Sequence, residues 1–207
     1  MGASIAAGLA LVALSGCQLS ATAPRPPERP GSLVLELEPA QSRAGGSVLY
    51  LEQSSDPRPR VTGAQRVAVV SEGPAFDPPL RVVRAGADLR FVNRGPLAHR
   101  LFIADDKGRR ERGVDPGGHS ELLRITRVGD HRFYCSLHPD EGFSVFASPS
   151  DHFVVTDGGS RYRLDDLPPG SYHLSRWSDA GVHWIGAVEI RPGGTARQTI
   201  SAGTAGP

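Results

Sequence analysis

The sequence has 207 residues and contains few residues of several types from which a function could be inferred. There are two cysteines, a single methionine (Met1), and aromatic residues make up only 6% of the chain. Two cysteines are too few for the disulfide framework of a small secreted domain. The formal net charge is only +1, so the chain has no overall attraction for polyanions and we expect no nucleic acid among its partners.

Long hydrophobic runs and the common catalytic motifs are also missing. We find no glycine-rich nucleotide loop, no HExxH zinc motif and no Ser/His/Asp arrangement, and we therefore expect that the protein is not an enzyme. Glycine (25 residues) and proline (18 residues) are abundant. This composition favours many short strands joined by turns and disfavours a helical bundle.

The N-terminus has the features of a bacterial targeting segment. Residues 4–14, SIAAGLALVAL, are uncharged and too short to span a bilayer, as in the apolar part of a signal peptide. The tetrapeptide LSGC follows and resembles the lipobox of bacterial lipoproteins, which implies a signal peptide over 1–17 and lipid attachment to Cys17. Residues 18–30 are rich in proline and predict an extended tether. The alternative is a buried apolar helix that contains a chance cysteine.

A lipid on Cys17 implies a periplasmic protein anchored to a membrane. The next residue is Gln18 and not the aspartate that is associated with inner-membrane retention in some bacteria, which slightly favours the outer membrane. We expect a monomer.

Short runs of alternating apolar and polar residues, typical of β-strands, follow the tether. From 31 to 55, the apolar positions are Leu33, Leu35 and Leu37 and then Val48 and Tyr50, on either side of a two-glycine turn signal. Similar runs fill residues 152–200. These patterns predict an all-β protein.

The middle of the chain contains seven further runs of this kind. They lie at 67–70, 80–83, 88–93, 99–104, 121–126, 131–135 and 143–147. About seven strands in such a length suit a small β-sandwich. Residues 105–118 are dense in charge and glycine, and we expect a solvated surface loop there.

One group of residues can carry chemistry. Cys135 and His138 are three residues apart, where a predicted strand runs into a loop, so a thiolate and an imidazole can reach one ion from the strand end. His99 begins another predicted strand, which would have to lie alongside. A His, Cys, His set with a weak fourth ligand describes a blue-copper electron-transfer site. Zinc is the weaker alternative, because structural zinc sites usually use more thiolates and catalytic ones keep an open water position.

This region is similar to the cupredoxin family. The segments VAVVSEGPAFDPPLRVVRAGADLRFVNRGPLAHRLF and HRFYCSLHPDEGFSVFAS resemble the plastocyanin-like domains of methylamine utilisation proteins. They share a strand ending in Asn with a histidine six residues later, and a final Cys-x-x-His-Pro loop. The resemblance implies a Greek-key β-sandwich over 60–149, copper as the cofactor, and His99, Cys135 and His138 as its ligands.

Two positions depart from the family pattern. Glu141 stands where relatives usually have an axial methionine, and the chain has no methionine besides Met1. A carboxylate ligand is harder, favours Cu(II), lowers the reduction potential and moves a blue site toward a red or green type. The alternative is that Glu141 points to solvent. Arg100 replaces an asparagine that braces the ligand loops in many cupredoxins.

The flanking regions resemble a second family. Residues 153–174, FVVTDGGSRYRLDDLPPGSYHL, look like the second half of a carboxypeptidase-regulatory-like domain, a small transthyretin-like sandwich, and residues 45–53 fit its preceding hairpin. We therefore expect a discontinuous sandwich made of 31–55 and 150–201, with the cupredoxin domain inserted between its strands. Such an insertion is tolerated because a domain whose termini lie close together closes the loop at little entropic cost. The alternative is two sandwiches in tandem.

Three functions from different classes follow from these features. The leading one is a membrane-tethered envelope carrier of single electrons that docks an unknown redox partner protein through an apolar patch around His138. For this docking, the near-neutral charge predicts a weak dependence on salt. The second is a copper-binding or trafficking protein, and the third is a metal-free scaffold lipoprotein of two sandwiches.

Overall fold

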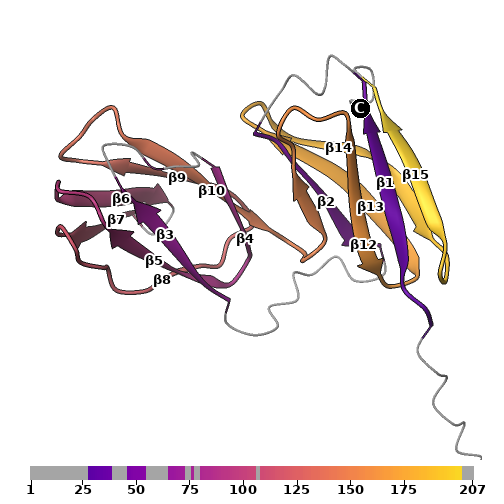
Figure 1. The fold of residues 1–207 in the computed structure, drawn as a ribbon, viewed down its shortest axis with the longest axis horizontal. Coiled ribbons are helices and arrows are strands. Elements are labelled where there is room, and N and C mark those ends of the chain that lie inside the picture. The colour runs from indigo at the N-terminus through magenta and orange to yellow at the C-terminus, as the bar shows by residue number, and fades with distance from the viewer. Residues whose placement is uncertain are drawn as a thin grey trace, which may run out of the picture.

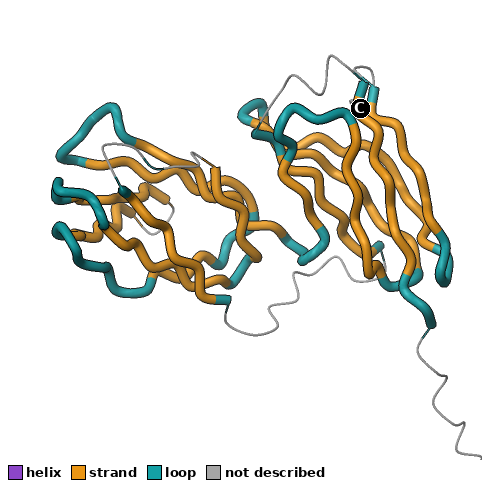
Figure 2. The backbone as a smooth tube through the Cα atoms, viewed as in Figure 1, coloured by secondary structure: helices purple, strands orange, loops and turns teal. Residues whose placement is uncertain are grey.

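The structure is a computed structural model that describes residues 28–38, 46–54, 65–72, 76, 80–105 and 108–201. Every regular element of these residues is a β-strand, which confirms the predicted all-β class (Figure 2). The predicted signal peptide, with the candidate lipidation site Cys17, and most of the predicted tether lie outside the described residues. The described part of the chain contains no helix that could cross a membrane.

The described residues form fifteen strands in two units (Figure 1). The outer unit contains β1 (Gly31–Leu37), β2 (Val48–Gln53), β11 (Phe153–Val155), β12 (Arg161–Leu167), β13 (Gly170–Ser178), β14 (Gly181–Ile190) and β15 (Thr195–Ile200). The middle unit contains β3 (Arg66–Ser71), β4 (Leu80–Arg84), β5 (Ala87–Asn93), β6 (His99–Asp105), β7 (Gly108–Val114), β8 (Leu123–Ile125), β9 (Gly129–Cys135) and β10 (Gly142–Ser148).

Strands from both ends of the chain build the outer unit. Its two sheets have the orders β12-β1-β15 and β11-β2-β13-β14. Strand β1 pairs with β12 and β15, and β2 pairs with β11 and β13. A buried apolar core lies between the two sheets, with Leu33, Leu35 and Leu37 on the β1 side and Tyr172 and Leu174 on the β13 side. That this sandwich belongs to the carboxypeptidase-regulatory-like family stays a prediction.

The middle unit is a second sandwich. Its sheets have the orders β4-β10-β9-β6-β7 and β3-β5-β8. Parallel pairs, β3 with β5 and β4 with β10, occur in both sheets, whereas the other pairs are antiparallel. Its core includes Phe91, Phe133 and Phe143, and the rings of Phe133 and Phe143 stack with centroids 5.0 Å apart.

The expectation of a solvated loop over 105–118 is wrong for residues 108–114. These residues form β7, which pairs with β6 over its whole length, from His99 opposite Val114 to Asp105 opposite Gly108. Strand β7 is an edge strand, so its arginines reach solvent and the apolar alternation that marks a half-buried strand is absent. The Arg109 guanidinium lies 3.7 Å from the ring centroid of Phe102.

A third apolar cluster joins the two units. Val48 and Tyr50 on β2 pack with Phe146 on β10 and Trp177 on β13. The ring centroid of Phe146 lies 5.5 Å from that of Tyr50 and 5.0 Å from that of Trp177. Strand β2 is therefore buried on both faces, because its alternate residues belong to the core of the outer unit. The far end of β10, at Gly142, lies four residues, about 13 Å along the strand, from Phe146 in this junction.

Candidate metal centre

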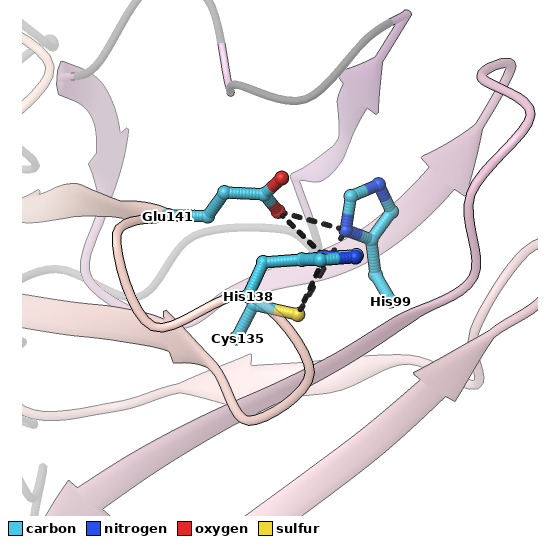
Figure 3. Close-up of side chains that lie close together, drawn as sticks. All are labelled: His99, Cys135, His138 and Glu141. Atoms are coloured by element: carbon cyan, nitrogen blue, oxygen red, sulfur yellow. Dashed lines mark hydrogen bonds and ion pairs between the residues drawn. The ribbon is translucent and has the colours of Figure 1, made fainter.

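Two neighbouring strands and one loop place the candidate ligands. His99 is the first residue of β6, and Cys135 is the last residue of β9, which pairs with β6. His138 and Glu141 lie on the loop between β9 and β10 (Figure 3). Two backbone hydrogen bonds tighten this loop: the Glu141 N–H donates to the His138 carbonyl, and the Cys135 N–H donates to the Glu141 carbonyl.

The structure brings these four side chains together around one point. One ligand atom from each lies within 4.8 Å of all the others. The Cys135 Sγ is 3.5 Å from Nδ1 of His138 and 3.9 Å from Nδ1 of His99. The Glu141 Oε2 is 3.1 Å from both Nδ1 atoms. Metal bonds of about 2.0–2.3 Å in a tetrahedral site would separate ligand atoms by about 3.3–3.8 Å, close to these values.

The Glu141 carboxylate tests whether a cation fits this centre. Its side chain is only 9% exposed, and Oε2 has no hydrogen-bond partner among the described residues, although both imidazoles are near. A buried anionic oxygen without a donor is costly. A cation between the four ligand atoms would satisfy this oxygen, so the donor set fits a metal ion. Glu141 does not point to solvent, contrary to the alternative considered from the sequence.

Groups beyond the four side chains hold two of them in place. The Arg100 backbone N–H points at the Cys135 Sγ at 3.5 Å, so Arg100 contributes through its backbone. The Nε2 of His99 is 3.2 Å from the Ser71 hydroxyl, and the Phe76 ring packs against the imidazole with centroids 5.3 Å apart. Ser71 and Phe76 were not among the predicted site residues, because no motif or spacing in the sequence relates them to His99.

Asn93 braces the loop that leads to His99. Its side-chain amide donates to the carbonyls of Leu97 and Val114, at 2.6 and 3.2 Å, and its Oδ1 accepts the Gly95 N–H at 2.9 Å. Asn93 therefore holds the backbone that leads to His99, whereas Arg100 occupies the position immediately after His99.

The surface around the centre is partly apolar. The His138 side chain is 27% exposed, whereas His99 and Cys135 are buried. Leu137 and Leu97 are 48% and 45% exposed and lie, in the chain, one residue before His138 and two residues before His99. The centre therefore reaches solvent through His138, beside exposed apolar side chains.

The remaining histidines stay apart from the centre. His131 is buried, and its Nε2 lies 2.7 Å from the Arg127 carbonyl. The ring of His152 packs edge-on against Tyr172. In the ranges that the structure describes, no second group of three or more His, Cys, Asp and Glu side chains could hold a metal.

No protein-family model matches this chain, and no curated protein matches it. Among solved structures, it is similar to a reduced mutant of amicyanin, with 14% identity, a TM-score of 0.38, and coverage of 48% of this chain and 98% of the other. Amicyanin from Paracoccus versutus has 16% identity to this chain and a TM-score of 0.37, and the match covers 48% of this chain and 98% of the amicyanin chain. A purple cupredoxin from Nitrosopumilus maritimus has 16% identity to this chain and a TM-score of 0.35, and the match covers 40% of this chain and 99% of the cupredoxin chain.

Proposed function

We propose that this protein binds copper through His99, Cys135, His138 and Glu141 and carries single electrons. The observation that carries the proposal is the convergence of one thiol, two imidazoles and a buried carboxylate whose Oε2 has no hydrogen-bond partner among the described residues. A thiolate with two imidazoles is the ligand set of copper electron-transfer sites. Copper bound there would supply a Cu(I)/Cu(II) couple.

The protein's part in electron transfer is to keep the ligands still. His99 and Cys135 belong to paired strands, and the short loop that carries His138 and Glu141 is closed by backbone hydrogen bonds. The N–H of Arg100 stabilises negative charge on the sulfur. Ligands that are fixed in advance need little rearrangement when the charge of the centre changes. No bond of a substrate is made or broken.

The exposed edge of His138 is the proposed exit for the electron. Leu97 and Leu137 offer apolar contact there, which suits the small interface of brief docking to a redox partner protein. We further propose that lipid on Cys17 anchors the protein to a membrane in the periplasm, most favourably the outer membrane. Labelled palmitate that is incorporated into the full chain, but not into Cys17→Ser, would support this anchor.

The experiment for copper uses the full chain with Cys17→Ser, in which Cys135 is the only cysteine. We expect added Cu(II) to produce an intense visible band of thiolate-to-copper charge transfer. This band must be absent from a second protein that also carries Cys135→Ala. Absence of the band and of retained copper from the parent protein would overturn the proposal and leave the metal-free scaffold function.

Copper trafficking is the second candidate function. It is favoured by Glu141, because a carboxylate stands where a methionine thioether would otherwise complete a redox site. The two functions differ in how firmly copper is held. Slow loss of copper to a chelator and rapid electron self-exchange support the carrier, whereas rapid loss and slow exchange support trafficking.

A further inference from the structure

The two ring nitrogens of His99 have different surroundings. Nδ1 faces Glu141 and Cys135 in the candidate centre. Nε2 faces the opposite way, toward the hydroxyl of Ser71 at 3.2 Å. The side chain of His99 is 1% exposed, so the ring has little access to water and depends on protein groups for its hydrogen bonds.

The two tautomers of a neutral His99 differ in the acceptor that each offers to the ring proton. A proton on Nε2 is donated to the Ser71 hydroxyl and leaves the Nδ1 lone pair free for a metal ion. In the other tautomer, the Nδ1 proton points into the ligand group. Its nearest oxygen, Oε2 of Glu141, is 3.1 Å away but makes no hydrogen bond in this geometry, and the remaining acceptor is the Cys135 Sγ at 3.9 Å, while the Ser71 hydroxyl would donate to Nε2. The ring proton thus has an oxygen acceptor at 3.2 Å when it is on Nε2 and only a more distant sulfur when it is on Nδ1, which favours the tautomer that can bind metal.

The backbone around Ser71 fixes its hydroxyl. Ser71 ends β3 and is buried, and its carbonyl accepts the N–H of Arg94 at 2.8 Å. It also forms an isolated bridge with Phe76, whose ring packs against the His99 imidazole. Strand β3, of the sheet that contributes no candidate ligand, thus holds the hydrogen-bond partner of His99, and Phe76, which is bridged to the end of this strand, is the packing partner.

We propose that Ser71 is a positioning residue of the metal centre, and that its hydroxyl holds His99 with Nδ1 directed at the metal before the metal binds. The proposal rests on the proposed function for the role of His99 as a ligand. It makes the orientation of His99 a property of the protein, present with or without copper. Removal of the hydroxyl should therefore change the spectrum and retention of copper more than it changes the fold.

The first test measures the tautomer of His99 directly. The full chain with Cys17→Ser is labelled with ¹⁵N and studied without metal by NMR, where the ring nitrogen shifts distinguish the two tautomers. We expect the proton on Nε2, and a mixture of tautomers in Ser71→Val. A parent protein with the proton on Nδ1 would overturn the proposal. This result does not depend on copper binding, so it stands if the proposed function fails.

The second test measures copper. In Ser71→Val we expect a shifted charge-transfer band and a 10–100-fold weaker affinity for copper, the usual range for lost outer partners of metal ligands. Ser71→Thr, which has the same shape as the valine variant but retains the hydroxyl, should restore both. An affinity in Ser71→Val within twofold of the parent, with an unchanged band, would contradict the role of Ser71. No copper band in the parent would instead contradict the proposed function.

Ser120→Ala is the matched control. Ser120 is another buried serine of the middle unit, and its hydroxyl accepts the Phe91 N–H at 3.0 Å, but it has no contact with the four candidate ligands. We expect this variant to lose stability and to keep the parent's copper spectrum and His99 tautomer. If Ser120→Ala shifts the spectrum as Ser71→Val does, the effect is general loosening of the unit and Ser71 has no special role.

Discussion

At the scale of single residues, Glu141 decides the character of the candidate centre. Its Oε2 is as close to one imidazole as to the other, at 3.1 Å, so the carboxylate belongs to the same group as the other three candidate ligands. A hard anionic oxygen stabilises Cu(II) more than Cu(I). The centre should therefore have a low reduction potential for a site of its ligand class.

Replacement of this carboxylate gives the first prediction. Glu141→Met should raise the reduction potential by at least about 59 mV, which is a tenfold change in the relative affinity for the two copper states. It should also move the charge-transfer spectrum toward the blue type. Voltammetry and visible spectroscopy measure both effects.

The control for this variant is Asp140→Asn. It removes one negative charge from the neighbouring exposed position, outside the ligand group. We expect a much smaller change in potential from it. Equal shifts in the two variants would show that Glu141 acts only through its charge, and an unchanged potential in Glu141→Met would remove it from the ligands.

The sequence predicted which residues meet in the candidate centre, but not what holds them. Cys135 and His138 are close in the chain, His99 begins a predicted strand that could lie alongside, and a family resemblance added Glu141, so all four were candidates before the structure was known. Ser71 lies 28 residues from His99 and belongs to the other sheet. A single serine at that separation carries no spacing signal, so only the packing of the two sheets reveals it.

At the scale of elements, the strands that have a buried face were predictable and the edge strand was not. Strands β5 and β9 alternate buried and exposed residues, and this alternation is visible in their sequences. Strand β7 is exposed on one face, and on the other face its partly buried residues are Arg110 and Arg112, so its sequence GRRERGV has the composition of a loop. Pairing with β6 makes it a strand, and the sequence of β7 alone does not predict this pairing.

A pair of glycine variants tests this edge strand. Gly108 begins β7 with φ of +87°, a conformation that costs other residues about 1–2 kcal/mol. Gly108→Ala should therefore lower the free energy of unfolding by about that amount. Gly113→Ala, further along the strand, should be nearly neutral, because an added Cβ there meets only the end of the flexible Arg100 side chain. Chemical denaturation measures both, and a neutral effect at Gly108 would fit a solvated loop instead.

At the scale of the whole molecule, the apolar junction makes the two units depend on each other. Alternation in β2 could not show this, because both of its faces are apolar and the sequence does not say which one meets the second unit. The chain leaves the middle unit through β10, whose Phe146 is fully buried and packs against Tyr50 and Trp177. The candidate centre lies at the other end of the same strand.

Loss of this junction should uncouple the two units. Phe146→Ala should cost about 3–5 kcal/mol, the usual range for a buried phenylalanine, and should turn one cooperative thermal transition into two. Differential scanning calorimetry measures the transitions. Val182→Ala, at an exposed position of β14, should leave a single transition near the parent's. One transition in Phe146→Ala would show that the cluster does not couple the units.

His152 lies where the chain returns from the middle unit to the outer one, and burial lowers its pKa below the ordinary value of 6.5. The neighbouring Asp151 acts in the opposite direction, and Arg84 adds to the effect of burial. The unfolded chain therefore takes up a proton on His152 at a higher pH than the folded protein does. The contribution of neutral His152 to the free energy of unfolding is fully present above pH 6.5. This contribution is lost as the pH falls from 6.5 toward the lowered pKa of the folded state.

The stability of His152→Gln should consequently depend less on pH than that of the parent. Below pH 6.5 the parent should lose stability faster than the variant, by no more than the slope of one full proton, about 1.4 kcal/mol per pH unit. Denaturation curves between pH 5 and 8, read as the difference between the two proteins, isolate this residue, because the other six histidines are present in both. Parallel curves would mean that His152 takes up its proton equally in the folded and unfolded chains, and His152 would then contribute nothing to the acid sensitivity of the protein.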